Sequence, residues 1–485
     1  MPDDNIAVAM PLPMGIRATG AATDEIDLAT LTLLKTQGDG GSISPDTITN
    51  KASSQAAHFG MLGGELNADN LAVAGWAVMY GASVSDSIKT NLTPLLDLRK
   101  KQVGDPTLFK ILDPPAPKQS ASDWLVAHKT SLNVVDPTMG VPYYVMIVAS
   151  PEEISFEFQY DLDLYWGVGR LWLQSEADFE RYAHSVVDYE TGTTVPTARK
   201  MVVFSPDYGG KDNGAQKILS DGLTTPLAKG LGPAQKFATQ SLTGSAATKS
   251  GLHNVLSGVD GTPAILFTGT HGFCQNADSA DLPAQQGALI CQEYQGGGAS
   301  PDKFYAASDL PAAMKTHGMV HFLYACYGVG FPRNDTYNYA KKVPIAPAPM
   351  MARLPQALLG HENGALAVLG HIDRAWSCSF NVDGLPPQDQ SFRDVLTKVM
   401  SGYRLGSATD QFNFRWAALT IPLADTLQKM QTRRGLEKRA ANLWTIRNDA
   451  RNYILHGDPA IKLRVSLAEM PETIIRPSIE RPATA

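Results

Sequence analysis

The sequence predicts an α/β fold built on a mostly parallel sheet. Near-continuous apolar runs that are rich in β-branched and aromatic residues are typical of buried strands. Tens of residues separate successive runs, which is long enough for crossover helices between parallel strands. Five runs carry the prediction: 141–150 (VPYYVMIVAS), 201–206 (MVVFSP), 264–270 (AILFTGT), 319–325 (MVHFLYA) and 365–370 (ALAVLG).

Three further segments complete the predicted elements. The run 163–173 (DLYWGVGRLWL) predicts a second strand after 141–150, and 175–190 predicts an amphipathic helix. Ser175 and Asp178 have the spacing of a capping box, in which each side chain accepts a backbone N–H of the other residue. The run 459–465 (PAIKLRV) predicts a short final strand. Strand and helix in alternation favour α/β units.

Composition and charge exclude several classes of protein. The chain has 485 residues, a net charge of -7 and a hydrophobic share of 44%, as in ordinary globular proteins. Because the chain has no excess of basic residues, we expect neither nucleic acid nor membrane as a partner. The acidic start MPDDN and the prolines after it do not resemble a signal peptide, and four cysteines are too few for a disulfide scaffold. We therefore expect a cytoplasmic protein with free thiols.

Two predicted strands end in a reactive side chain beside a glycine. The run AILFTGT leads into His271 and Gly272, and MVHFLYA leads into Cys326, with Gly328 shortly after it. Parallel α/β sheets bind ligands beyond the carboxyl ends of their strands, so neighbouring strands would bring the imidazole and the thiol to one cleft. An imidazole can take the thiol proton during nucleophilic attack. The pair therefore predicts Cys326 as nucleophile and His271 as its acid–base partner.

The backbone amides of Gly272 and Cys326 are the predicted oxyanion hole. Small residues beside both reactive groups let N–H donors approach the carbonyl oxygen that becomes charged. The alternative for each residue is plain packing, because a lone buried Cys or His is often structural. A zinc site built from His271, Cys274 and Cys291 lacks a Cys-x-x-Cys pair and a clear fourth ligand, so we predict no metal.

The order of motifs resembles the gingipain family of caspase-like cysteine peptidases, and also separase and caspases. In gingipains a His-Gly strand, an Ala-Cys strand, a Trp-containing loop and a Gly-Asp-Pro segment follow one another. This chain has THG (270–272), YACYG (324–328), HIDRAWS (371–377) and HGDPAIKLR (456–464). The resemblance implies a caspase-like three-layer fold with two consecutive α/β subdomains. We place them at 116–195 and 196–466, the second being catalytic, after an N-terminal region 1–115 of unclear fold and before a tail 467–485.

Four further residues take their roles from the resemblance. Asp207 lies where the family has a carboxylate that supports the catalytic histidine, although it could equally cap its loop. Asp221 lies where Arg-specific members have an Asp at the floor of the specificity pocket, although it could be a helix N-cap. Trp376 matches the aromatic residue beside that pocket, and its alternative is a core Trp. Asp373 is a second acidic candidate, because separases carry a specificity Asp in this loop.

The function expected from these residues is cysteine-type endopeptidase activity on a protein or peptide substrate. The resemblance implies cleavage after Arg or Lys. It also leaves Ca²⁺ open, because relatives often bind that ion, whereas the residues themselves predict no cofactor. The rival from another class is a catalytically silent scaffold or interaction protein with the same fold. The oligomeric state stays open.

Overall fold

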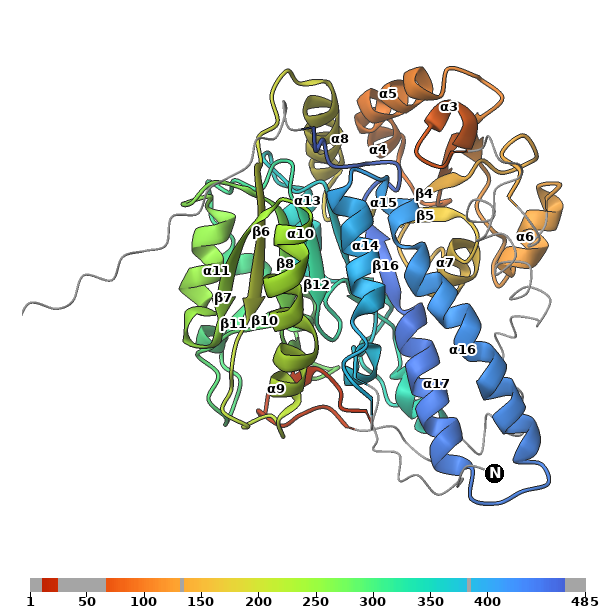
Figure 1. Ribbon diagram of the computed structural model, residues 1–485. Helices are drawn as coiled ribbons and strands as arrows, with labels where there is room; N and C mark the ends of the chain where they lie inside the picture. The colour runs from red at the N-terminus through yellow and green to blue at the C-terminus, as the bar shows by residue number, and fades with distance from the viewer. Residues whose placement is uncertain (1–10, 25–66, 131–134, 382–384, 467–485) are drawn as a thin grey trace, which may run out of the picture.

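A ten-stranded sheet forms the centre of the computed structural model, which describes residues 11–24, 67–130, 135–381 and 385–466 (Figure 1). Its strand order is β3-β2-β4-β5-β16-β15-β12-β8-β6-β7, and β15–β16 is the one antiparallel pair between these neighbours. The strands are β2 (Trp76–Tyr80), β3 (Phe109–Leu112), β4 (Tyr144–Val148), β5 (Gly167–Arg170), β6 (Ala198–Ser205), β7 (Ala238–Thr243), β8 (Pro263–Gly269), β12 (Val320–Tyr324), β15 (Ala367–His371) and β16 (Tyr453–His456).

Helices cover both faces of this sheet. In Figure 1 the helices α14, α16 and α17 lie in front of the strands and α13 lies behind them. The helices are α3 (Leu71–Ala74), α4 (Asp86–Asn91), α5 (Thr93–Val103), α6 (Ala121–Ala127), α7 (Phe156–Asp163), α8 (Glu176–Thr191), α9 (Ala215–Leu219), α10 (Gly232–Ala234), α11 (Lys249–Leu256), α12 (Leu282–Gln285), α13 (Arg353–Leu359), α14 (Gln390–Met400), α15 (Leu405–Ala408), α16 (Asp410–Lys429) and α17 (Glu437–Arg451). The predicted α/β fold with a mostly parallel sheet is confirmed.

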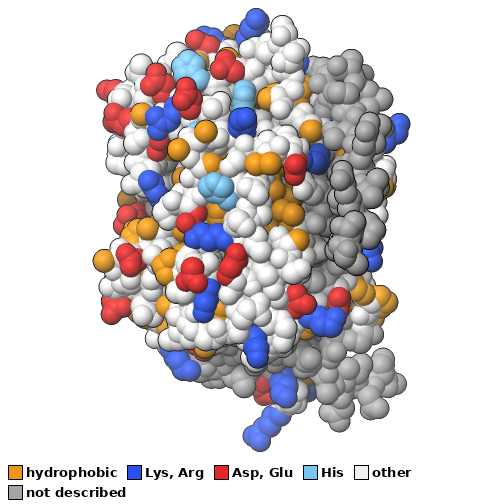
Figure 2. Space-filling model, turned by 90° about the vertical axis from the view of Figure 1, so that its left-hand side faces the viewer, with side chains coloured by type: hydrophobic (Ala, Val, Ile, Leu, Met, Phe, Trp, Pro, Cys, Tyr) orange, Lys and Arg blue, Asp and Glu red, His pale blue; other side chains and the backbone are white. Residues whose placement is uncertain are grey.

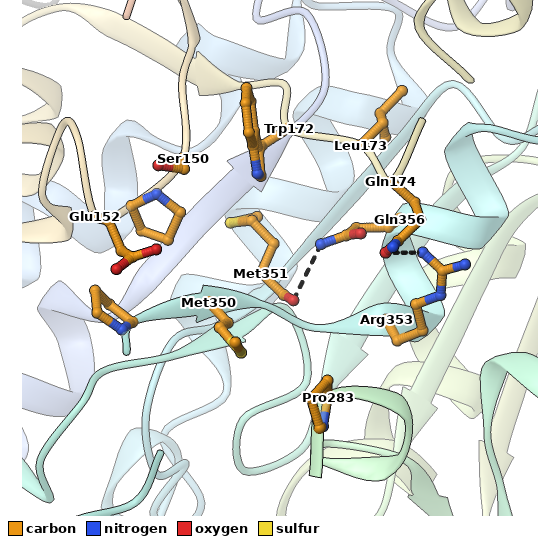
Figure 3. Close-up of a pocket in the computed structure, with 12 residues that line it drawn as sticks. Ser150, Glu152, Trp172, Leu173, Gln174, Pro283, Met350, Met351, Arg353 and Gln356 are labelled. Carbon is orange, nitrogen blue, oxygen red and sulfur yellow. Dashed lines mark hydrogen bonds between the residues drawn. The ribbon is translucent and has the colours of Figure 1, made fainter. Parts of the chain in front are cut away.

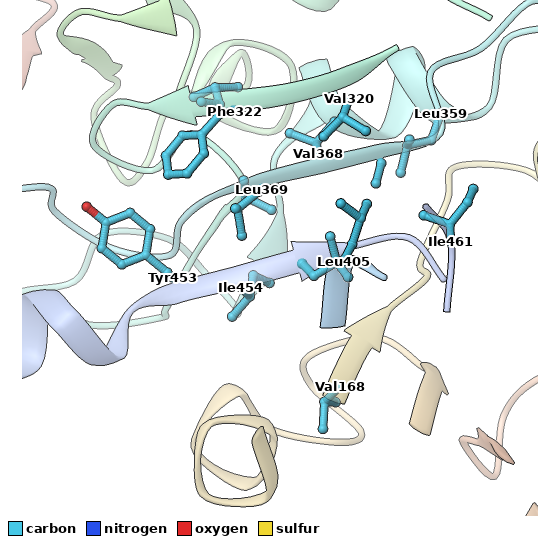
Figure 4. Packing of buried hydrophobic residues seen from close by; sticks show 14 of the residues in the cluster. Val168, Val320, Phe322, Leu359, Val368, Leu369, Leu405, Tyr453, Ile454 and Ile461 are labelled. Atoms are coloured by element: carbon cyan, nitrogen blue, oxygen red, sulfur yellow. The ribbon is translucent and has the colours of Figure 1, made fainter. Parts of the chain in front are cut away.

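The middle of the sheet is dry and aromatic. Figure 4 shows Phe322 of β12 and Tyr453 of β16 reaching toward each other past Leu369 of β15. Phe412 of α16 stacks on Tyr453, with the ring centroids 4.0 Å apart and the planes 10° from parallel. Strands buried on both faces are mostly apolar, and for this reason the sequence predicts these runs as strands.

Most predicted elements form where the sequence indicated. The five apolar runs coincide with β4, β6, β8, β12 and β15 to within three residues at either end. Helix α8 begins behind Ser175, which accepts the Asp178 N–H while the Asp178 carboxylate accepts the Ser175 N–H, so the predicted capping box is confirmed.

Two strand predictions were wrong in extent or place. The run 163–173 forms only the four-residue β5, because α7 ends at Asp163 and residues 164–166 form the turn that follows it. The run 459–465 forms no strand. The last strand is β16, which ends at His456, because the chain turns at Gly457 with a φ of 135° and Pro459 then lacks a backbone N–H.

Two small sheets lie beside the large one. The first has the order β1-β9-β10-β11, formed by Gly15–Arg17, Gly272–Cys274, Leu289–Ile290 and Phe304–Tyr305. Strand β1 pairs in parallel with β9, so a segment near the start of the chain lies against the residues that follow His271. The second is the antiparallel pair β13 (Gly330–Phe331) and β14 (Met350–Met351).

Strands β2, β3, β4 and β5, which precede residue 195, form one side of the large sheet, and β6, β7, β8, β12 and β15 form the other. The subdomain boundaries at 115, 195 and 466 stay predictions, and the tail 467–485 lies outside the described residues. None of the described helices is long and apolar enough to cross a membrane. On the face in Figure 2, acidic and basic side chains are interspersed and neither sign dominates.

Candidate active site

Most of the predicted site residues lie just beyond the carboxyl ends of four neighbouring strands, at one edge of the sheet. Strands β6, β8, β12 and β15 are parallel neighbours, so their carboxyl ends point the same way. The expected adjacency of β8 and β12 is therefore confirmed. The loops that leave these ends carry Asp207, His271, Cys326, Asp373 and Trp376. Residues 11–24, drawn in red, run along the lower end of the sheet in Figure 1.

His271 is held by a carboxylate that the sequence did not identify. The imidazole Nε2 of His271 lies 2.8 Å from Oδ2 of Asp212, and both side chains are buried. Asp212 also accepts the Gln216 N–H at 2.6 Å. Burial alone would raise the pKa of Asp212, but the hydrogen bond from His271, its charge and the Gln216 N–H lower it below its usual value. Among the described residues, the Nδ1 atom of His271 has no hydrogen-bond partner.

The prediction that Asp207 supports His271 was wrong. Asp207 is exposed, and its carboxylate accepts the N–H of Gly209 at 2.9 Å within its own loop. Asp207 therefore caps its own loop, which was the alternative to a role beside His271. The loop DYGGKD after β6 contains two carboxylates, and only the fold of the loop decides which of them turns inward toward the imidazole.

Cys326 is fully buried at the end of β12. Its Sγ accepts the Ala375 N–H at 3.3 Å. Burial and the nearby Cys274 thiol raise the pKa of Cys326 well above its usual value. The next residue, Tyr327, has a φ of 58°, and its N–H donates to Asp373, which has a φ of 69°, at 2.7 Å. A positive φ is unusual for a bulky residue such as Tyr327, and strain of this kind concentrates at functional sites.

The amides predicted as the oxyanion hole converge on one oxygen. The N–H groups of Gly272 and Cys326 both donate to the carbonyl oxygen of Met14, at 3.0 and 3.2 Å. This approach requires a glycine, because a Cβ on Gly272 would lie 1.8 Å from the carbonyl oxygen of Cys326. The two strand ends are therefore packed backbone to backbone.

Gly272→Ala should consequently disrupt this amide pair. The new methyl group forces the His271 loop away from Cys326, so we expect activity to fall at least 100-fold, as when one oxyanion donor is lost. Peptide hydrolysis and thermal unfolding would be measured together. Gly298→Ala is the control, because a Cβ there meets its nearest atom at 3.6 Å. Equal activity of both variants would contradict the role of Gly272.

An extended segment of the same chain lies across these groups. Met14 donates its N–H to Ala375 at 2.8 Å, the Ser377 N–H donates to Leu12 at 2.9 Å, and Pro13 bridges Trp376 in antiparallel fashion. Beyond Met14 the chain continues as β1 beside β9. No motif in the sequence indicated this segment.

Asp221, which was predicted to form the floor of a specificity pocket, is exposed on the surface of the protein. Its carboxylate pairs with Lys217 one helical turn away at 2.6 Å, and 65% of the side chain is exposed. Asp221 lies on the π-helical turn Ser220–Thr224, where an exposed pair gives little energy and no pocket floor.

Trp376 is buried in a packed cluster, as expected for a core Trp and not for a residue that borders a substrate pocket. Its ring lies 4.8 Å from that of Tyr337. The guanidinium of Arg374 lies 5.7 Å from the Trp376 ring and is ion-paired with Asp335. The Arg374 guanidinium thus occupies the face of the Trp376 ring that was predicted to contact a substrate side chain.

Asp373 is also buried and already has partners. Its carboxylate accepts the Thr336 hydroxyl and the Arg374 N–H. Burial and the negative charge of Asp335 raise the pKa of Asp373 above its usual value.

A separate cavity of about 320 Å³ has none of the predicted site residues in its lining (Figure 3). Figure 3 shows Trp172 and Leu173 on one side, with Met350, Met351 and Arg353 around them, and Gln356 donates to the Met351 carbonyl at 3.1 Å. Across the described residues, no group of three or more His, Cys, Asp or Glu side chains is arranged to hold a metal ion.

Comparisons with known proteins give a distant structural likeness. No protein-family model matches the chain, and no curated protein matches its sequence. Among solved structures, the Arg-specific cysteine proteinase gingipain R aligns over 81% of this chain and 79% of its own, at 12% identity and a TM-score of 0.46. A complex of the pro- and mature domains of RgpB from Porphyromonas gingivalis aligns over 81% and 80%, at 13% identity and a TM-score of 0.45.

Proposed function

We propose that this chain is a cysteine endopeptidase of the caspase-like type. Cys326 is the nucleophile, His271 the acid–base residue, and the amides of Gly272 and Cys326 the oxyanion hole. The observation that supports this most strongly is the pair of N–H donors on the Met14 carbonyl oxygen, in the loops that carry the imidazole and the thiol. Preorganised donors at the place of a developing oxyanion are the main source of catalysis in acyl transfer.

The hydrogen bond between His271 and Asp212 assigns a different role to each nitrogen of the imidazole in the proposed reaction. With Nε2–H donating to Asp212, the lone pair is on Nδ1, which accepts the thiol proton and later returns it to the leaving amine. The Asp212 carboxylate fixes this tautomer and stabilises the imidazolium that forms. Burial and the nearby Cys274 raise the pKa of the Cys326 thiol, and in the proposed reaction His271 takes its proton during the attack.

The substrate is proposed to be a protein or peptide, in a cytoplasmic setting. Cleavage after Arg or Lys was expected from the resemblance, with Asp221 or Asp373 as the acceptor. Asp221 is exposed, and Asp373 is engaged by Thr336 and by the Arg374 backbone. A basic preference would therefore require Arg374 to leave the Trp376 face and make room for a substrate cation.

Labelling with a peptidyl acyloxymethyl ketone tests the proposal. We expect the probe to modify Cys326 at least 100-fold faster than Cys274, Cys291 and Cys378, because among these cysteines only Cys326 contributes its own backbone N–H to the proposed oxyanion hole. All four thiols are buried and free, so burial alone does not select one of them. Peptide mapping of the labelled protein identifies the site. Equal labelling of the four thiols, without cleavage of a peptide library, would favour the silent scaffold instead.

A further inference from the structure

The segment that covers the candidate site is arranged as a substrate would be. Its residues before the Met14 carbonyl pair antiparallel with 375–377, through Met14 N–H to Ala375 and Ser377 N–H to Leu12. Its residues after that carbonyl form β1 beside β9. Backbone pairing on both sides of one peptide bond is how extended peptides dock on sheet edges.

The bond at the centre of this arrangement is Met14–Gly15. The Met14 carbonyl oxygen receives both donors of the oxyanion pair. A Cβ on Gly15 would lie 2.9 Å from Thr23, 3.0 Å from the Cys274 Sγ and 3.1 Å from the Cys326 Sγ. Glycine at this place therefore lets the chain pass close to both thiols. Met14 is fully buried, so its side chain is enclosed.

We propose that Met14–Gly15 is an internal substrate, cleaved by Cys326 of the same chain. This inference rests on the proposed function. The Cys326 sulfur attacks the Met14 carbonyl carbon as His271 takes the thiol proton. The carbon–nitrogen bond then breaks, and the Gly15 nitrogen leaves as an amine with that proton. Water hydrolyses the Met14 thioester, which gives a Met14 carboxylate and restores the Cys326 thiol.

The same contacts assign a class of substrate. The residues on the acyl side are Leu12, Pro13 and Met14, which are apolar, and the enclosed Met14 side chain marks a site for an unbranched apolar residue. The nearby acceptors that could bind a basic substrate side chain are already occupied, because Arg374 donates to Asp335 and to the carbonyl oxygen of Asp24. The enzyme should therefore prefer Leu-Pro-Met over Leu-Pro-Arg on the acyl side of the cleaved bond.

Cleavage would also uncover the site. Cys326 is fully buried while residues 12–14 lie over it. Once the bond is broken, those residues are joined to the rest of the chain only by non-covalent contacts, whereas β1 keeps its connection toward Thr23. The half of the site that binds the acyl side of a substrate would then be open.

The test follows the purified full-length chain over time by intact mass spectrometry and N-terminal sequencing. Wild type should yield a chain that begins at Gly15 and a fragment that ends at Met14, with a half-time that does not depend on protein concentration. Cys326→Ala should remain uncut. Cleavage of both proteins, or a rate that rises with concentration, would overturn the proposal. A wild-type chain that stays intact at this bond would overturn it as well.

Two variants separate the role of Met14 from general instability. Met14→Asp places a carboxylate in an enclosed apolar site, so self-cleavage should slow at least tenfold while probe labelling of Cys326 becomes faster. Met139→Asp is the matched control, because Met139 is 48% exposed, and it should cleave itself as wild type does. Unchanged self-cleavage in Met14→Asp would overturn the assignment of this bond.

Probe labelling distinguishes the two proposals from each other. If wild type labels at Cys326 and hydrolyses library peptides while Met14–Gly15 stays intact, the internal-substrate proposal fails and the peptidase proposal stands. If Cys326 neither labels selectively nor supports hydrolysis, both fail. In the peptide assay, Leu-Pro-Met should be cleaved at least tenfold faster than Leu-Pro-Arg, and the reverse order would overturn the assigned substrate class.

Discussion

Cys326→Ala should abolish peptide cleavage, lowering turnover on the order of 10⁵-fold or more, because no thioester can form without the sulfur. The change removes one atom from a buried site and adds none, so β12 and its neighbours should keep their packing. Hydrolysis of a fluorogenic peptide and circular dichroism of the same sample measure both effects.

Cys291→Ala is the matched control for this loss. Cys291 is equally buried, but it follows β10 and its thiol donates to the Leu289 carbonyl at 3.4 Å. Its removal should cost stability to a similar degree and leave turnover within about twofold, since it contacts none of the reacting groups. Residual activity in Cys326→Ala comparable to that of Cys291→Ala would end the assignment of the nucleophile.

Asp212→Asn should lower turnover on the order of 100-fold or more, whereas Asp207→Asn should change it little. The Asp212 carboxylate accepts the His271 Nε2–H, and an amide nitrogen in that place would favour the opposite tautomer, with the proton on Nδ1. Asp207 is exposed and contacts only its own loop and Gln292. Both variants replace a carboxylate by an amide in the same loop. Comparing them therefore separates the role of Asp212 from the general effect of an Asp→Asn change.

A pH profile shows whether Asp212 acts through the imidazole. Loss of the carboxylate removes the negative charge that stabilises imidazolium, so the acidic limb of the kcat/KM profile should move to lower pH in Asp212→Asn. A purely structural role would lower activity without moving that limb. Equal effects of Asp207→Asn and Asp212→Asn would contradict the assignment of Asp212 as the positioning residue.

The sequence by itself determined the elements whose signal is local. The runs that became β4, β6, β8, β12 and β15 are mostly apolar, because strands covered on both faces bury nearly every side chain. The carboxyl ends of neighbouring parallel strands share an edge, so a reactive residue just past each of β8 and β12 was enough to bring His271 and Cys326 to one side of the sheet.

Tertiary structure decided everything that depends on which way a loop folds. Asp207 and Asp212 are five positions apart in one loop, and only its path turned Asp212 toward His271. Trp376 could have bordered a pocket, but Arg374 and Tyr337 packed against it. The pairing of Leu12–Met14 with residues 375–377 joins segments more than 350 positions apart by backbone hydrogen bonds, which use no particular side chain and therefore leave no motif in a sequence.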